Sequence, residues 1–332
     1  MGKKAPIILF AVTALTLSTM VTFNVLDTFV FAHEEGKVDD RSGFDFDESS
    51  TTSAATATKT ISDLSSSSSQ SNATNITSSL DPATHTVVEF TSSTYPVGNK
   101  NVPYHLCKIH LKKLSDFRTK VATNSAGSYG SNIRQSFGTL IKNAESEQNV
   151  HVIAAISGDF AFWKGRTGYV VRNGYTYRSS QRTTTGEDLA IFKDGTIMSY
   201  LESDYSLADL NATHNGIWQN FSFGPTLLYG GEIQVEENEE IDGQTMTQNQ
   251  RTAIAFDSEG YLYFLSTEVV GNRNSSSAAS FSLHTLATFF RERGCFLAYN
   301  LDGGDSSAFY YEGKEYASAD RNLGDIIYVV DA

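Results

Sequence analysis

The chain has 332 residues, of which 40% are hydrophobic and 12% aromatic, and its formal net charge at pH 7 is −13. That length allows one or two domains with a substantial core. So acidic a chain repels nucleic acid, and we expect no nucleic-acid partner. Its two cysteines, Cys107 and Cys295, are too few for a disulfide framework. One bridge is possible, but two buried free thiols are the favoured interpretation.

The N-terminal segment, residues 1–32, is predicted to be a cytoplasmic stub and a transmembrane anchor. Lys3 and Lys4 precede an apolar run from Ala5 to Leu26, and a helix needs about 20 such residues to cross a bilayer. The lysines orient the short N-terminus towards the cytoplasm. A cleaved signal peptide, giving a secreted form, is the alternative, but the run exceeds the usual signal core of ~7–15 residues. We therefore expect a single-pass protein of the cell membrane with an extracellular C-terminal domain.

Residues 33–83 are expected to form a disordered stalk. The segment is acidic from Asp39 to Glu48 and rich in serine and threonine from Ser49 to Leu80. It has too few large apolar side chains to offset the conformational entropy lost on folding. The stalk therefore separates the anchor from a folded domain that spans residues 84–332.

Alternation and apolar runs in residues 84–332 predict an α+β domain. Strands are expected at 86–90, 102–109, 150–156, 190–192, 252–256, 261–265, 296–301 and 326–330. Two amphipathic helices are expected, one from Ser131, as its N-cap, to Glu145 and one from Ser282 to about Arg293. Strands outnumber helices and turn signals are frequent, which favours a mixed or antiparallel sheet with a few packed helices.

The segment 300–307, with the sequence Asn-Leu-Asp-Gly-Gly-Asp-Ser-Ser, follows a predicted strand directly. Asp302 would stand at the strand end as a reactive carboxylate. Gly303 and Gly304 permit positive φ and a close approach of ligand to backbone, and their N–H groups could bind an anion. Ser306 could donate to phosphate oxygens. An ordinary Asp-Gly turn is the alternative interpretation.

Two further segments carry candidate site residues. Asp159 follows a predicted strand as a possible second carboxylate, and Arg172 stands shortly after it as a possible phosphate ligand. The alternative is a hairpin with Asn173-Gly174 at its tip. Arg251 enters a later strand, where it could hold an oxyanion bidentately. Arg321 is a similar candidate beside turn residues.

Other chemistries lack their sequence patterns. The chain has no P-loop, no HExxH and no G-x-S-x-G motif, and its seven histidines are scattered. No metal site and no cofactor are therefore expected. Asp302 and Asp305 could still hold a hard cation such as calcium, although their spacing is not that of an EF-hand.

Together these segments resemble the phosphodiester glycosidase family over residues 84–330. The similar pieces occur in the family's order: Gly158–Phe160, Gly168–Gly174, Phe223–Pro225, Arg251–Ile254, Ser282–Leu283, Asn300–Ser307, and Arg321 with Asp325–Tyr328. The chain departs from the family pattern at four places. Ser157 stands where the family has Asn, Gln250 where it has Pro, and Asp305 where it has a third Gly. Residues 271–273, Gly-Asn-Arg, stand where the family has Asp-Gly-Arg.

The resemblance implies hydrolysis of a sugar–O–P bond at the anomeric carbon, without a required cofactor. It implies catalytic roles for Asp302, Asp159 and Arg251. The substrate and its phosphate would be bound by Gly303, Gly304, Ser306, Ser307, Arg321, Arg172 and Asn300. A sugar phosphodiester or an envelope polysaccharide is the expected substrate. The alternatives are an inactive carbohydrate- or phosphate-binding module, and a metal-assisted phosphodiesterase.

Overall fold

The computed structural model describes residues 74–76, 80–130, 132–163, 166–182, 186–237, 249–273, 275 and 277–332. The predicted anchor and most of the predicted stalk lie outside these residues and stay predictions. The end of the stalk is corrected, because Thr74–Ile76 forms a short strand that pairs with residues 90–92. Within the described part, no helix is both long enough and apolar enough to cross a membrane.

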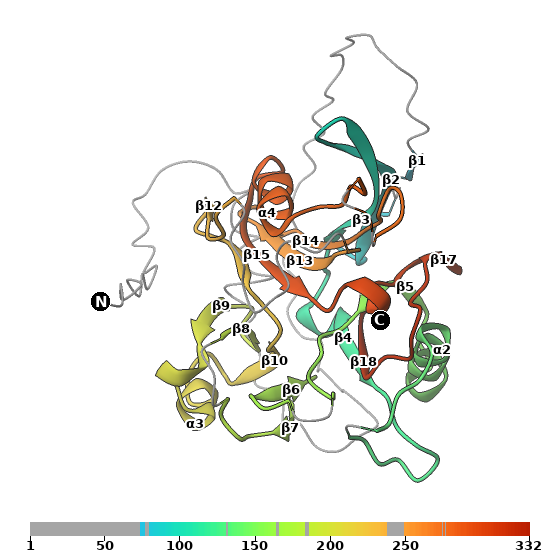
Figure 1. Ribbon diagram of the computed structural model, residues 1–332. Coiled ribbons are helices and arrows are strands. Elements are labelled where there is room, and N and C mark those ends of the chain that lie inside the picture. Colours follow the sequence, from blue (N-terminus) through green and yellow to red (C-terminus); the bar gives the residue numbers. More distant parts are fainter. Residues whose placement is uncertain are drawn as a thin grey trace.

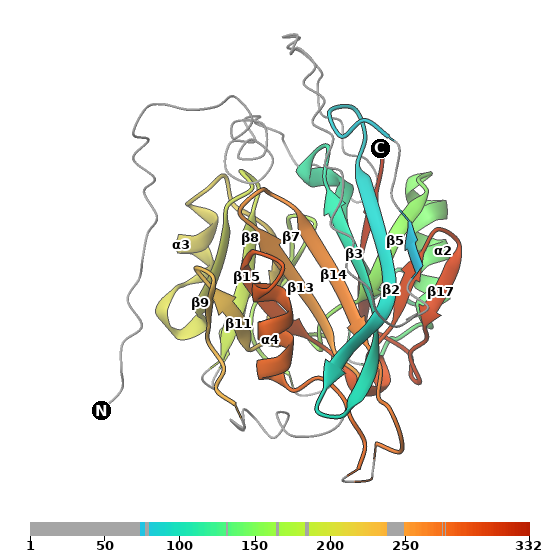
Figure 2. The same ribbon diagram turned by 90° about the horizontal axis from the view of Figure 1, so that it is seen from above.

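Three antiparallel sheets make up most of the described domain (Figures 1 and 2). The largest runs in the order β1 (Thr74–Ile76), β2 (Val87–Val97), β3 (Lys100–His110), β14 (Leu262–Thr267), β13 (Thr252–Asp257), β15 (Cys295–Leu301), β11 (Thr226–Tyr229) and β12 (Glu232–Ile233). The second runs β7 (Tyr175–Arg178), β6 (Val170–Arg172), β10 (Ile217–Phe221), β8 (Glu187–Phe192) and β9 (Ile197–Leu201). The third runs β17 (Lys314–Ala317), β16 (Phe309–Tyr311), β5 (Val152–Ser157), β18 (Asp325–Val330) and β4 (Phe117–Val121).

One central apolar core joins the three sheets. Inward-facing side chains of the largest sheet, such as Phe90 and Phe264, belong to the same cluster as Ile156 and Ile327 of the third sheet and Trp218 of the second. Alternate residues of each strand point to opposite faces, so one face of every sheet contributes to this core. The expected α+β class is confirmed, with every strand pair antiparallel and with three sheets in place of one.

The described part contains three α-helices, α2 (Phe137–Gln148), α3 (Leu207–Asn211) and α4 (Leu283–Arg291), each packed on a different sheet. The second predicted helix is confirmed, because the Ser282 hydroxyl accepts from the amide of Thr285 (3.0 Å) as its N-cap. The first begins later than predicted. Ser136, and not Ser131, is its N-cap and accepts from the Thr139 amide; Ser131 itself lies outside the described residues.

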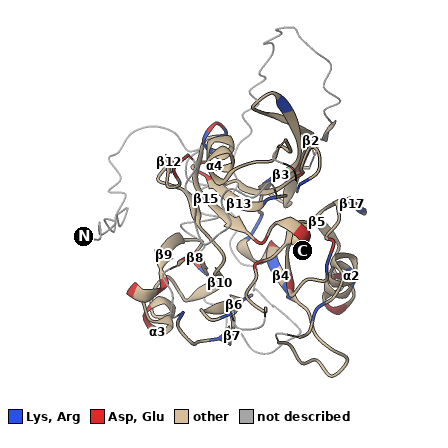
Figure 3. Cartoon of the chain, viewed as in Figure 1, with Lys and Arg blue, Asp and Glu red and all other residues tan. Residues whose placement is uncertain are grey.

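Both cysteines are buried free thiols, as predicted. The hairpin at Asn173-Gly174 also forms, and it joins β6 to β7 with Arg172 opposite Tyr175. Strand β4 was not predicted, because its sequence Phe-Arg-Thr-Lys-Val mixes charged and apolar residues. All five residues are nevertheless buried. Arg118 donates to Gln148 (2.6 Å), and Lys120 forms an ion pair with Glu147; Figure 3 shows the basic residues of β4 in blue.

Candidate active site

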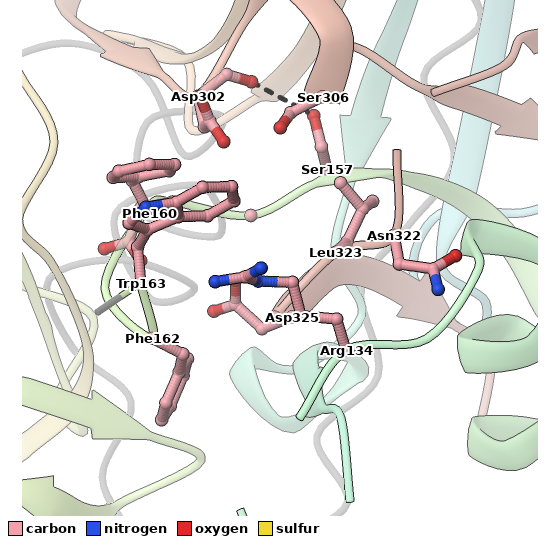
Figure 4. A pocket seen from close by; sticks show the side chains of 13 residues that line it. Arg134, Ser157, Phe160, Phe162, Trp163, Asp302, Ser306, Asn322, Leu323 and Asp325 are labelled. Atoms are coloured by element: carbon pink, nitrogen blue, oxygen red, sulfur yellow. Dashed lines mark hydrogen bonds between the residues drawn. The ribbon is translucent and has the colours of Figure 1, made fainter. Parts of the chain in front are cut away.

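A pocket opens where β5 and β15 end and β18 begins (Figure 4). It is lined by Arg134, Ser157, Gly158, Asp159, Phe160, Phe162, Trp163, Asp302, Ser306, Asn322, Leu323, Gly324 and Asp325. Below it, hydroxyl groups join the two strand ends. Ser157 donates to the Asp302 carbonyl (3.3 Å) and lies 3.1 Å from the Thr252 hydroxyl, which in turn lies 3.1 Å from that of Ser307.

Asp302 and Ser306 line this pocket, and Arg321, which is not itself a lining residue, contacts both of them. Arg321 Nη2 lies 3.0 and 3.2 Å from the two carboxylate oxygens of Asp302, and its Nε donates to Ser306 Oγ (2.6 Å). The Asp302 side chain is 13% exposed. Burial raises the pKa of Asp302 above its ordinary value, although Ser306 and Arg321 act in the opposite direction. The site therefore holds a partly buried carboxyl group against an arginine that is still partly open to solvent.

Asp159 and Arg172 lie deeper and belong to a buried ion-pair network. Arg172 donates to Asp159 Oδ1 and to Asp325 Oδ2, both at 2.7 Å, and these three side chains are at most 1% exposed. The second oxygen of Asp159 accepts the amide of Ser222 (2.8 Å). The structure therefore corrects the prediction that Arg172 binds phosphate directly, because two carboxylates enclose its guanidinium group. Asp159 is held in the same way, with its carboxylate directed into this network.

Asp325 completes the network, and the sequence did not single it out as a site residue. It begins β18 and lines the pocket wall. Burial raises its pKa to about 7, and the charge of Asp159 adds to this while Arg172 opposes it. A Cβ on Gly158 would lie 2.3 Å from Asp325 Oδ1, so glycine is required there for the loop after β5 to pass over the carboxyl group.

We expect Asp325→Asn to flatten the dependence of stability on pH. The pKa of Asp325 is about 7 in the folded protein against an ordinary 3.8. The folded state therefore keeps a proton that the unfolded chain loses, and this contribution is complete below pH 4 and lost as the pH rises to 7. One such group changes the free energy of unfolding by at most about 1.4 kcal/mol per pH unit. Urea unfolding between pH 4 and pH 8 measures it, with exposed Asp305→Asn as the control; equal slopes in all three proteins would contradict the assignment.

The amide of Gly304 is not available for the expected anion-binding nest. Residues 304–306 form a short 3₁₀ turn, and the amide of Gly304 donates to the carbonyl of Gln250 (2.8 Å). The amides of Ser306 and Ser307 are also used within the turn, at 3.0 Å each. A Cβ on Gly303 would lie 2.5 Å from the Gln250 carbonyl. Close packing against β13 thus explains Gly303, and the hydroxyl of Ser306 is the donor that this turn brings to the pocket.

Three other predicted residues lie away from the pocket lining. Asn300 is buried and donates to the Gly224 carbonyl (2.9 Å), and Ser307 is buried beside Thr252. Arg251 is 5% exposed, and its Nε donates to the carbonyl of Phe281 (3.0 Å). Burial lowers the pKa of Arg251 to about 10. Arg251 directly precedes Thr252, which pairs with Leu301, so its backbone lies beside that of Asp302, and its catalytic role stays a prediction.

Two of the departures from the family pattern make side-chain contacts. Ser157 supports the Asp302 backbone, as described above. Gln250 contacts Gly304 only through its backbone carbonyl, and nothing in the structure explains the change from proline. Asp305 lies on the surface, where it forms an ion pair with Arg273. Asp302 and Asp305 are thus each paired with a different arginine, and the described residues contain no group of three histidines, cysteines or carboxylates that could hold a metal.

Sequence reasoning missed Arg134, Phe160 and Trp163 as pocket residues. Arg134 lay within the predicted first helix, where an arginine usually faces solvent. Phe160 was noted only as part of a Gly-Asp-Phe piece. Phe160 stacks on Trp163, with 4.4 Å between the ring centroids. This contact depends on the conformation of the loop after β5, which the periodicity of the sequence does not predict.

A family profile described as phosphodiester glycosidase matches residues 150–330, a region that includes Asp159, Asp302 and Arg321. The match and the carboxyl–arginine pocket define a hydrolase-type domain. The chain belongs to the phosphodiester glycosidase family.

A solved structure shares the fold. The catalytic domain of zebrafish N-acetylglucosamine-1-phosphodiester alpha-N-acetylglucosaminidase, auto-inhibited by its pro-peptide, aligns with a TM-score of 0.58 and 19% identity, over 77% of this chain and 87% of that one. A hypothetical protein from Synechocystis aligns with a TM-score of 0.47 and 12% identity, over 74% of this chain and 62% of the other. Comparison with curated proteins finds no match.

Proposed function

We propose that the protein is an extracytoplasmic hydrolase that cleaves the glycosidic bond of sugar-1-phosphodiesters. Membership of the phosphodiester glycosidase family supports the class of reaction. The observation that carries the proposal for this chain is the contact of Asp302 with Arg321 at the pocket (3.0 Å). This contact supports the proposal, because a carboxyl group and a cation held this close could both act on one substrate.

The chemistry of the leaving group explains this pairing. Cleavage at the anomeric carbon releases a phosphate monoester, whose second pKa is about 6, far below that of an alcohol. Such a leaving group needs its charge neutralised more than it needs a proton, which is the role we assign to Arg321. Asp302 then serves the anomeric carbon or the attacking water. Ser306 orients Arg321, and the buried Asp159–Arg172–Asp325 network holds the loop that forms the pocket wall.

Turnover of a panel of sugar-1-phosphodiesters tests the proposal directly. We expect release of free sugar and phosphomonoester from at least one member, without added metal. Binding without turnover by any member would instead favour a carbohydrate- or phosphate-binding module. Release of a sugar 1-phosphate, lost on chelation, would favour a metal-assisted phosphodiesterase.

The location of the substrate follows from the N-terminus. The apolar run 5–26 and the stalk 33–83 support tethering of the domain outside a cell membrane, close to envelope polysaccharides that contain sugar-1-phosphate links. Protease treatment of intact cells should then release a fragment that begins within the stalk. Recovery of the full chain in the cytosol would contradict this location.

We expect Arg321→Ala to lower kcat on a phosphodiester by roughly 10²–10³-fold, as loss of an oxyanion donor does. The loss should be smaller on an aryl glycoside of the same sugar, whose leaving group gains less from a cation. Arg321→Lys should restore activity only in part, because an ammonium group cannot contact Ser306 and Asp302 in the same bidentate way. Arg273→Ala, on the surface, is the control. Equal losses on both substrates would mean that Arg321 acts only through Asp302.

A further inference from the structure

Three arginines lie close to a stacked pair of aromatic rings at the pocket. Phe160 and Trp163 lie with their ring centroids 4.4 Å apart and an interplanar angle of 18°. The guanidinium carbons of Arg134 and Arg321 lie 3.6 and 4.9 Å from the Trp163 centroid. That of Arg166 lies 5.4 Å from the Phe160 centroid. Three arginines thus gather at one pair of rings in a chain with a net charge of −13, and they face a pocket that Asp159, Asp302 and Asp325 also line.

Arg134 is the member of this group whose geometry is most suited to bind an anion. It comes from the segment before α2, on the opposite side of the pocket from the loop after β5, and Figure 4 shows its side chain extended towards Trp163. Stacking occupies the face of a guanidinium group, whereas its N–H donors lie in the plane. The stack with Trp163 therefore fixes the plane of the Arg134 guanidinium group, and a fixed plane favours bidentate binding of an oxyanion.

The neighbouring arginine makes an anion favourable here. Arg321 is tied to Asp302 and Ser306 and contacts the same Trp163 ring. Burial, and after it the charge of Arg321, lowers the pKa of Arg134. Two like charges held beside one ring repel each other, and an oxyanion between them would relieve the repulsion.

We infer that Arg134, oriented by Trp163, binds the phosphate group of the substrate and selects an anionic phosphodiester over a neutral glycoside. This inference rests on the proposed function for the position of the phosphate next to the scissile bond. Arg134 precedes residues 150–330, the region that the family profile matches. It is therefore a specificity residue of this chain that family membership does not assign.

Binding of inorganic phosphate and of α-D-glucose 1-phosphate tests the inference without any turnover. Calorimetric titration of the full chain should show affinity for both anions lowered roughly 10–100-fold in Arg134→Ala, the usual effect of losing a charge-assisted hydrogen bond. Arg134→Lys should be intermediate. Arg293→Ala is the matched control, because Arg293 stacks 3.3 Å from the Phe289 centroid, outside the pocket lining. Unchanged affinity in Arg134→Ala, or no phosphate binding by the wild type, would overturn the inference.

Kinetics separate this inference from the proposed function. On a sugar phosphodiester that the wild type hydrolyses, Arg134→Ala should raise KM by a similar factor, with little effect on an aryl glycoside of the same sugar. Equal effects on both substrates would overturn the selectivity that we infer. If the wild type hydrolyses no sugar phosphodiester but Arg134→Ala still weakens phosphate binding, the phosphate site stands and the proposed function fails.

Discussion

Asp302→Asn should lower kcat by at least 10²–10⁴-fold on any sugar phosphodiester that the wild type cleaves, because proton transfer by a positioned carboxyl group contributes about that much. The amide keeps the shape of the side chain and can still accept from Arg321, so KM should change little. Stability should also be nearly unchanged. Burial already raises the pKa of Asp302, which means that its negative charge gains little from the folded environment.

The control for this substitution lies three residues away. Asp305→Asn removes a carboxylate from the same segment, but one that is 44% exposed and paired with Arg273 on the surface. It should keep wild-type kinetics. Steady-state rates and thermal melts of both variants test whether Asp302 is catalytic. A near-normal rate in Asp302→Asn would mean that Asp302 has only a structural role in the turn.

Arg172→Met should destabilise the domain by about 3–5 kcal/mol, the usual cost of removing one partner from a buried ion pair. Methionine fills much of the same space, so the loss would come from the carboxylates of Asp159 and Asp325, which are 0% exposed and would lose their shared cation. Adding Asp325→Asn should recover part of the loss, because it removes one of the two stranded groups.

Arg273→Met tests whether burial is the cause. Arg273 also pairs with an aspartate, but both side chains are more than 40% exposed. Exposed pairs contribute about 0–1 kcal/mol, so this variant should unfold near the wild-type urea midpoint. Similar losses in Arg172→Met and Arg273→Met would contradict the account of the buried network.

The sequence predicted the long, strongly patterned elements and missed those whose stability depends on tertiary contacts. The strands at 252–256 and 261–265 carry apolar side chains in an unbroken run, and both form close to their predicted bounds. In β4, by contrast, burial of Arg118 and Lys120 is made possible by partners on α2. No local pattern contains that information, because the partners lie about 30 residues further along the chain.

The same distinction applies to the site. Asp302 at a strand end and Ser306 beyond the double glycine could be recognised from local sequence, and the structure brings both to the pocket with Arg321. Sequence could not tell that Arg172 is enclosed by two carboxylates, or that Arg134 crosses the pocket to Trp163. These positions depend on how the three sheets pack together. No local sequence pattern distinguishes an arginine in a buried ion pair from one that lines a pocket.

Hydrolysis in ¹⁸O-labelled water tests the central claim most directly. The reaction is run on a sugar-1-phosphodiester identified in the turnover panel. The products are separated, and the mass of each is measured by mass spectrometry. Attack at the anomeric carbon, with the phosphate as leaving group, predicts that the label enters the free sugar and that the phosphomonoester stays unlabelled. Label in the phosphate would show that the P–O bond is cut, and would contradict the assignment of Asp302 and Arg321 to a glycosidase reaction.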